Sequence, residues 1–284
     1  MSKVPVDRSS FDEILGLTCI ENYVLAVLAK CLNHTYLYYD SFVEVADVIE
    51  EIFGKKVGFA FFRIIPRVHK SAMADGIISY QSVDLDSICD AIDFVSYCCL
   101  EVKPDWFSSR YGTTAWRDDH YIMIEKRTGR EYYFINDNPR DDGVMDEDEV
   151  VSLFAGSLFL FRVEDASIDC RREVFLDRMK NKLNSAVLGR DVLDLCHGHT
   201  LAQLRDFLGV LKISRKRMEA FIRNYISTEF MKEYIRELEK HFVGIEYMRL
   251  RNNSDDYAKM KILRDILSKD TEMIKLLRQS LGGL

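Results

Sequence analysis

The N-terminal half of the chain shows two hydrophobic periodicities, one typical of helices and one typical of strands. Residues 20–32 carry apolar side chains at positions 20, 24, 27, 28 and 31, which is the spacing of one helix face. The same spacing predicts a helix over residues 41–53, ended by Gly54, and another over residues 83–97, with Asp84 as its N-cap.

A strand periodicity begins at residue 120. The segments "HYIMIEK" and "EYYFIND" are short, aromatic and β-branched, and "RTGR" joins them, so they predict an antiparallel hairpin with a glycine turn. The next segments predict a loop at "DNPRDDG", a short helix at "MDEDEVVSLF" and a closing strand at "GSLFLFRVE".

Beyond about residue 168 the pattern is helical only. Long amphipathic stretches cover residues 172–188, 201–211, 215–250 and 257–281. We therefore expect two domains, an α+β domain with an antiparallel sheet over residues 1–167 and an all-helical C-terminal domain over residues 168–284.

Composition and charge exclude several classes of function. The net charge of −7 leaves no broad basic face for nucleic acid. The chain shows neither a signal peptide nor the roughly 18 consecutive apolar residues of a membrane span, so a cytoplasmic protein is expected. The 7 cysteines include no CxxC pair and are expected to be reduced. "CHGHT" resembles a metal-binding cluster, but a turn between helices explains it better, and no metal or bound cofactor is expected.

Cys19 stands directly before the apolar face of the first helix, in the stretch "GLTCIEN". Unpaired amides and the helix dipole at such a position stabilise a thiolate, which predicts a lowered pKa and a nucleophile. The same amides can hold the oxyanion that forms on an attacked carbonyl. A cysteine packed near a helix end is the simpler alternative.

His120 and Asp137 complete a candidate catalytic group with Cys19. His120 opens one strand of the predicted hairpin and Asp137 ends the other, so the pairing of the strands brings them close together. His120 is then the general base, and the carboxylate of Asp137 orients its ring. Asn136 and Asn138 are rivals for the orienting role, and strand alternation allows only one of Asn136 and Asp137 to face His120. A half-exposed strand histidine and a turn aspartate are the simpler alternatives.

This order of cysteine at a helix start, histidine heading a strand and Asp or Asn ending the next strand resembles that of papain-like cysteine peptidases. The "H-strand-turn-strand-NDNP" phrase is similar to the bacteriocin-leader peptidase-like branch. "TCIENYVLAVLAKCLN" resembles the butirosin side-chain acyltransferase group and, more closely, the closthioamide-type amide synthetase, which builds amides from carrier-bound thioesters. The resemblance covers roughly residues 10 to 163 and implies a papain-like catalytic domain with Cys19, His120 and Asp137 as its triad.

The resemblance implies a thiotemplated acyltransferase of antibiotic biosynthesis. Cys19 would take an acyl group from the phosphopantetheine thioester of an acyl carrier protein and pass it to a small amine or diamine. Asp118 and Asp119, directly before His120, are candidates for binding that amine, and the basic stretch "LKISRKR" is a candidate for docking the carrier. Papain-like peptidases place an oxyanion-hole glutamine before the cysteine, whereas this chain has Glu13 and no glutamine before Gln81. A cysteine peptidase or amidohydrolase and a non-catalytic binding module remain the alternatives.

Overall fold

The computed structural model describes residues 6, 11, 16–29, 33–55, 61–87, 97–112, 120–164, 171–188, 192–251 and 255–283. The chain divides into two compact units, the first made of Met1–His34 and His69–Asp169 and the second of Thr35–Val68 and Cys170–Leu284. The sequence pattern assigned residues 35–68 to the N-terminal domain. They belong instead to the second unit, because the short helices of this segment pack against helix α9 (Leu201–Ile222).

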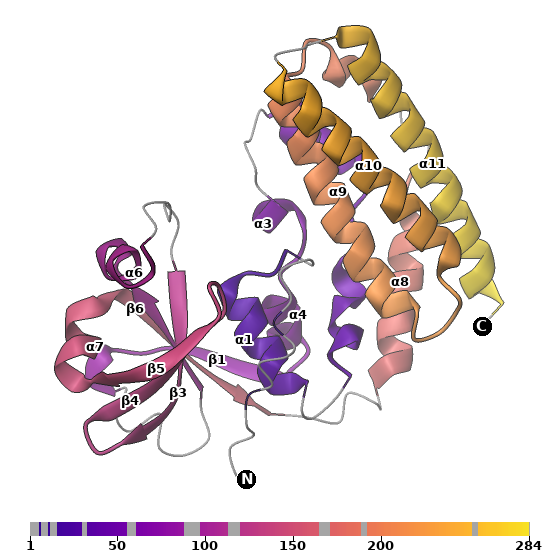
Figure 1. The fold of residues 1–284 in the computed structure, drawn as a ribbon. Coiled ribbons are helices and arrows are strands. Elements are labelled where there is room, and N and C mark those ends of the chain that lie inside the picture. The colour runs from indigo at the N-terminus through magenta and orange to yellow at the C-terminus, as the bar shows by residue number, and fades with distance from the viewer. Residues whose placement is uncertain are drawn as a thin grey trace. The chain divides into compact units, whose positions relative to one another are not determined.

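A six-stranded sheet forms the centre of the first unit (Figure 1). The strand order is β1-β6-β2-β3-β4-β5, and all five neighbouring pairs are antiparallel. The strands are β1 (Ile78–Ser82), β2 (Tyr97–Val102), β3 (His120–Thr128), β4 (Glu131–Asn136), β5 (Asp141–Asp146) and β6 (Phe154–Val163). The expected α+β class with an antiparallel sheet is therefore confirmed.

The predicted hairpin is confirmed as β3 and β4. Their register pairs Met123 with Ile135, and Gly129 in the connecting turn has a positive φ of 63°, a conformation that glycine adopts without steric cost. The predicted loop "DNPRDDG" is only partly a loop, since β5 begins at Asp141, which pairs with Asn136.

The helix predicted over residues 83–97 is only partly testable. Leu85–Ser87 form one turn of 3₁₀-helix, η4, and strand β2 already begins at Tyr97, whereas residues 88–96 lie outside the described part of the chain. Strand β2 escaped prediction because it is buried along its length and lacks the alternation that marks a half-exposed strand.

Helices cover the sheet of the first unit. They are α1 (Cys19–Leu28), α4 (Val68–Ala74), α6 (Pro104–Tyr111) and α7 (Glu147–Leu153). Helix α1 packs against β3, and α7 packs beside β4 and β5. Phe107 of α6 and Val150 of α7 lie in one core cluster with Leu100, Ile122 and Phe134 of the sheet. Helix α1 is buried along almost its whole length, so its position on the sheet is set by packing.

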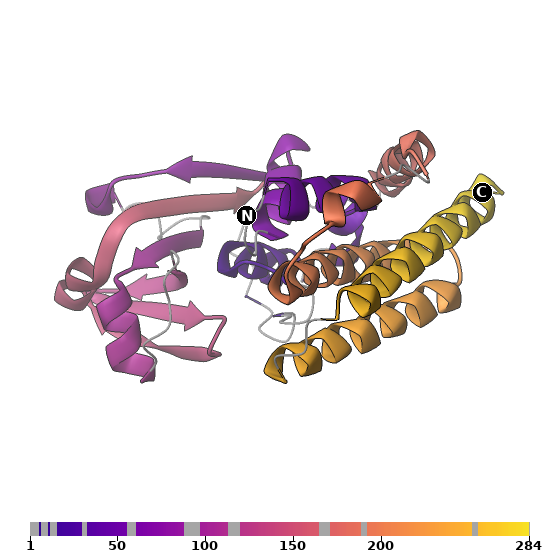
Figure 2. The same ribbon diagram turned by 90° about the horizontal axis from the view of Figure 1, so that it is seen from above.

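The second unit is helical, as expected for the C-terminal region. Its long helices are α8 (Arg172–Ser185), α9 (Leu201–Ile222), α10 (Glu229–Leu250) and α11 (Asp256–Gly282). Figure 2 shows α9, α10 and α11 side by side. Its shorter elements are η2 (His34–Asp40), α2 (Val45–Ile49), η3 (Glu50–Gly54), α3 (Phe61–Ile64) and η6 (Leu193–Cys196). Helix α2 together with the π-turn η3 confirms most of the helix predicted over residues 41–53.

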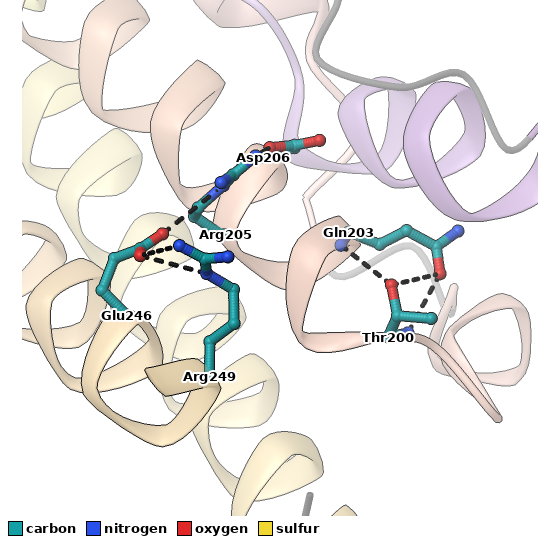
Figure 3. Close-up of polar contacts among 6 residues, drawn as sticks. All are labelled: Thr200, Gln203, Arg205, Asp206, Glu246 and Arg249. Carbon is teal, nitrogen blue, oxygen red and sulfur yellow. Dashed lines mark hydrogen bonds and ion pairs between the residues drawn. The ribbon is translucent and has the colours of Figure 1, made fainter. Parts of the chain in front are cut away.

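Polar contacts at the surface of the second unit define where α9 begins and tie it to α10 (Figure 3). Thr200 and Gln203 cap the first turn of α9 reciprocally. Arg205 pairs with Asp206 at 2.8 Å and with Glu246 of α10 at 3.5 Å. Among the described residues, none of the helices combines the length and apolar character needed to cross a bilayer.

Candidate functional site

Cys19 is the first residue of α1, as the sequence pattern predicts. A capping box forms around it, in which the Thr18 amide donates to Glu21 Oε2 at 2.9 Å and the Glu21 amide donates to Thr18 Oγ1 at 3.2 Å. The next two amides of this turn, those of Cys19 and Ile20, interact with the Cys19 sulfur, and so does the amide of Tyr121. The sulfur therefore lies beside the peptide bond that joins His120 to Tyr121.

The prediction of a lowered thiol pKa is wrong. Burial of the sulfur, followed by the negative charge of Asp137, raises the pKa of Cys19 to about 12, and the three amides offset only part of that rise. The residue is half-buried as a whole, but its sulfur is desolvated. Moving a thiolate out of water costs more free energy than the partial charges at a helix start contribute in its favour. At neutral pH the resting site therefore holds a thiol.

His120 is the first residue of β3 and is buried, with its ring against Phe107 at a centroid distance of 4.5 Å. Its Nε2 atom lies 2.6 Å from Oδ1 of Asn136. The Asn136 amide nitrogen donates to the Pro139 carbonyl at 2.7 Å, so its oxygen is the atom that faces the ring. Nε2 is then the protonated nitrogen and donates the hydrogen bond, which leaves Nδ1 as the basic atom of the neutral ring.

Burial lowers the pKa of His120 below its ordinary value of 6.5, although Asn136 and the charge of Asp137 act in the opposite direction. At neutral pH the imidazole is therefore uncharged. An uncharged imidazole can accept a proton from a thiol, which is what a general base for Cys19 must do.

Asp137 does not make the hydrogen bond to His120 that the sequence pattern assigned to it. Its carboxylate accepts from Asn22 Nδ2 at 2.8 Å and contacts the Tyr23 hydroxyl at 3.3 Å, both from α1. The physical reason is that β4 ends at Asn136, so Asp137 is the first residue of the following turn, where Asn22 and Tyr23 bind its carboxylate. Asn136, the rival candidate, is the residue bound to the ring.

Asp137 nevertheless belongs to the same cluster of groups. Its negative charge contributes to the raised pKa of Cys19 and opposes the lowering of the pKa of His120 by burial, and burial raises the pKa of Asp137 itself. Asp137 therefore lies near enough to act on both Cys19 and His120, and Asn136 binds the His120 ring.

Asn22 and Tyr23 are site residues that the sequence analysis missed. Asn22 is a buried amide of α1, and an amide in that position needs a hydrogen-bond partner. This was the available signal, but nothing local in the sequence identifies Asp137 as the partner.

Of the remaining sequence candidates, some fall outside the described residues and the others make different contacts. Asp118, Asp119 and Glu13 fall outside the described residues. In "CHGHT", Cys196 and His199 are buried, and the His199 ring is bound to the Cys196 carbonyl. In the part of the chain that the structure describes, no group of three or more His, Cys, Asp or Glu side chains is placed to hold a metal ion.

The basic stretch "LKISRKR" is not an exposed docking patch. Arg215 is completely buried and pairs with Asp270 through two contacts of 2.8 Å, and Arg217 is 1% exposed. Lys216 pairs with Glu239 at 2.6 Å, and the Lys212 ammonium lies over the Phe242 ring at 4.3 Å. Helix α9 turns its two arginines into the second unit, where they serve packing.

A comparison of the chain with models of known protein families finds no match, and a comparison with curated proteins finds none either. The functional argument therefore rests on the residues of the site.

Proposed function

We propose that the protein is a cysteine-dependent acyltransferase in which Cys19 is the nucleophile, His120 the general base and Asn136 the residue that orients the base. One observation carries the proposal. The Cys19 sulfur interacts with the amide of Tyr121, the residue after His120, and Asn136 Oδ1 lies 2.6 Å from Nε2 of the His120 ring. A nucleophile, a base and an orienting group in this order are the parts that covalent acyl transfer needs.

The first half-reaction moves the acyl group onto the enzyme. Nδ1 of His120 takes the thiol proton as the Cys19 sulfur attacks the carbonyl carbon of a thioester. The amides of Cys19 and Ile20, which interact with the sulfur, are the proposed donors to the oxyanion that develops. The C–S bond of the donor then breaks, and the departing thiolate takes the proton from His120. The enzyme is left as a neutral acyl-thioester.

The second half-reaction releases the acyl group. An amine attacks the acyl-Cys19 carbonyl and gives a proton to His120, an amide bond forms, and the Cys19 thiolate recovers the proton. Water in place of the amine would give a free acid by the same steps. Thioester exchange keeps the acyl group activated, which suits a cysteine enzyme that must pass it to an amine.

The resemblance of the sequence to thiotemplated amide synthetases favours the amine. On that basis we assign the first unit a papain-like fold, an acyl carrier protein with a phosphopantetheine thioester as donor, and a small amine or diamine as acceptor for a specialised metabolite. Asp118 and Asp119 are the proposed amine-binding residues. A cysteine peptidase or amidohydrolase is the second candidate, because the same acyl-enzyme serves both reactions.

Intact mass measurement after incubation with an acyl-pantetheine thioester tests the proposal. We expect the wild-type protein to gain the mass of one acyl group, Cys19→Ala to gain none, and Cys196→Ala, which removes a buried cysteine of the second unit, to behave as wild type. Addition of a diamine should release an amide. Release of free acid alone would favour the hydrolase, and an unacylated wild type with several acyl donors would favour a binding module.

A further inference from the structure

Tyr23 connects the helix that carries Cys19 to the two strands that carry the other site residues. It lies four residues after Cys19, on the same face of α1, and its side chain is completely buried. Its hydroxyl group donates to the Tyr121 carbonyl at 2.8 Å. The same oxygen accepts from the Asp137 amide at 3.3 Å. One side-chain atom therefore joins α1 to β3 and to the end of β4.

The neighbouring residue makes a parallel connection. Asn22 Nδ2 donates to Asp137 Oδ2 at 2.8 Å, and the other carboxylate oxygen lies 3.3 Å from the Tyr23 hydroxyl. The contacts of Asn22 and Tyr23 join residues that are 98 to 115 positions apart in sequence, so they act between elements and not within the helix. Through these contacts Asn22 and Tyr23 bind the chain at Tyr121, directly after His120, and at Asp137, directly after Asn136.

We propose that Tyr23 is a positioning residue, whose hydroxyl holds the start of α1 against β3 and β4 and so aligns the Cys19 sulfur with the His120 ring. This inference rests on the proposed function, because alignment matters only if the thiol gives its proton to His120. Proton transfer requires the two groups to be in hydrogen-bond reach, and a displacement of about 1 Å costs on the order of 100-fold in rate.

Tyr23→Phe removes the hydroxyl and keeps the ring, including its edge contact with Phe11 at 5.9 Å. Tyr132→Phe is a matched control, since Tyr132 is also buried in the first unit but packs in the core cluster with Phe134 and Met145. Both variants are first compared with wild type by thermal unfolding, so that rates are measured where each protein is folded.

Two rates are then measured at pH 7, the alkylation of Cys19 by iodoacetamide, followed by peptide mass, and kcat for amide formation. We expect Tyr23→Phe to lower each about 10-fold or more, with KM for the donor unchanged within about twofold. Tyr132→Phe should stay within about twofold of wild type. Equal rates in folded Tyr23→Phe and wild type would overturn the inference.

A double-mutant cycle with His120→Gln separates alignment from a general loss of structure. If Tyr23 acts through His120, Tyr23→Phe should lower alkylation in the wild type but have little further effect in the His120→Gln background. Equal effects in both backgrounds would show a purely structural role and refute the inference. A failure of the proposed function gives a different result, namely that His120→Gln itself leaves Cys19 alkylation unchanged, and both proposals then fall.

Discussion

The ring of His120 is held by Asn136, with Nε2 and Oδ1 2.6 Å apart, whereas the adjacent Asp137 is bound by α1. Two consecutive residues at the end of one strand thus serve different elements. Asn136 keeps the imidazole in one tautomer, and Asp137 binds helix α1 and brings a negative charge near the Cys19 thiol and the His120 ring. In the proposed mechanism, the charged and orienting roles that a single aspartate fills in many triads are therefore divided between these two neighbours.

Asn136→Ala should therefore lower kcat by roughly 100-fold, because the His120 ring loses its orientation. Asn136→Asp retains an oxygen acceptor and should keep more of the activity than Asn136→Ala. Asn138→Ala, at an exposed position of the same turn, is the matched control and should change kcat by less than about twofold. Steady-state kinetics with a fixed thioester donor give the comparison, and a folded Asn136→Ala variant with wild-type kcat would contradict the assignment.

The pH dependence of Cys19 acylation should reflect a neutral thiol and a neutral imidazole. Because burial lowers the pKa of His120 below 6.5, the rate should rise through a midpoint below pH 6.5 as the imidazole loses its proton. Because the pKa of Cys19 is raised to about 12, no second midpoint should appear between pH 7 and 9. Single-turnover acylation from pH 5 to 9 measures this. A fall in rate near pH 8 to 9 would instead indicate a thiolate–imidazolium pair.

The free energy of unfolding at alkaline pH should also depend on the raised pKa of the Cys19 thiol. The unfolded chain loses the Cys19 proton near pH 9, whereas the folded protein holds it to about 12, so ionisation of this thiol favours unfolding between those values. Over that range the free energy of unfolding should fall with pH by up to about 1.4 kcal/mol per pH unit more in the wild type than in Cys19→Ala. Urea unfolding from pH 8 to 10.5 tests the difference. Parallel curves for the two proteins would mean that the sulfur is not desolvated.

The second unit contains a buried ion pair whose disruption should be costly. Arg215 is completely buried and meets both carboxylate oxygens of Asp270. Asp270→Asn leaves the guanidinium charge without its carboxylate partner and should lower the free energy of unfolding by about 3–5 kcal/mol. Lys216→Ala, which removes a partly exposed ion pair on the same helix, should cost less than about 1 kcal/mol.

Urea unfolding of both variants gives the comparison. Replacing both partners by apolar residues, as Arg215→Met with Asp270→Leu, should recover much of the stability that Asp270→Asn loses, because no buried charge is then left alone. A small effect of Asp270→Asn would show that water reaches the pair.

Local pattern determined a large part of this structure. Three patterns each mark a face that must be buried: the helical spacing after Cys19, the period-two alternation on both sides of Gly129 and the amphipathic stretches beyond residue 170. Such a pattern predicts a helix or strand whatever that element packs against. For this reason α1, the β3–β4 hairpin and the C-terminal helices follow from the sequence. Strand β2 does not follow from the sequence, because a strand that is buried on both faces shows no alternation of apolar and polar residues.

Only the tertiary structure decided how the site residues are paired and charged. Alternation indicated that either Asn136 or Asp137 faces His120, but the choice between them depended on α1, whose Asn22 and Tyr23 bind Asp137. The raised pKa of the Cys19 thiol could likewise not be predicted from the local sequence. The helix start favours the thiolate through short-range dipoles, whereas the burial of the sulfur that outweighs them exists only in the folded chain.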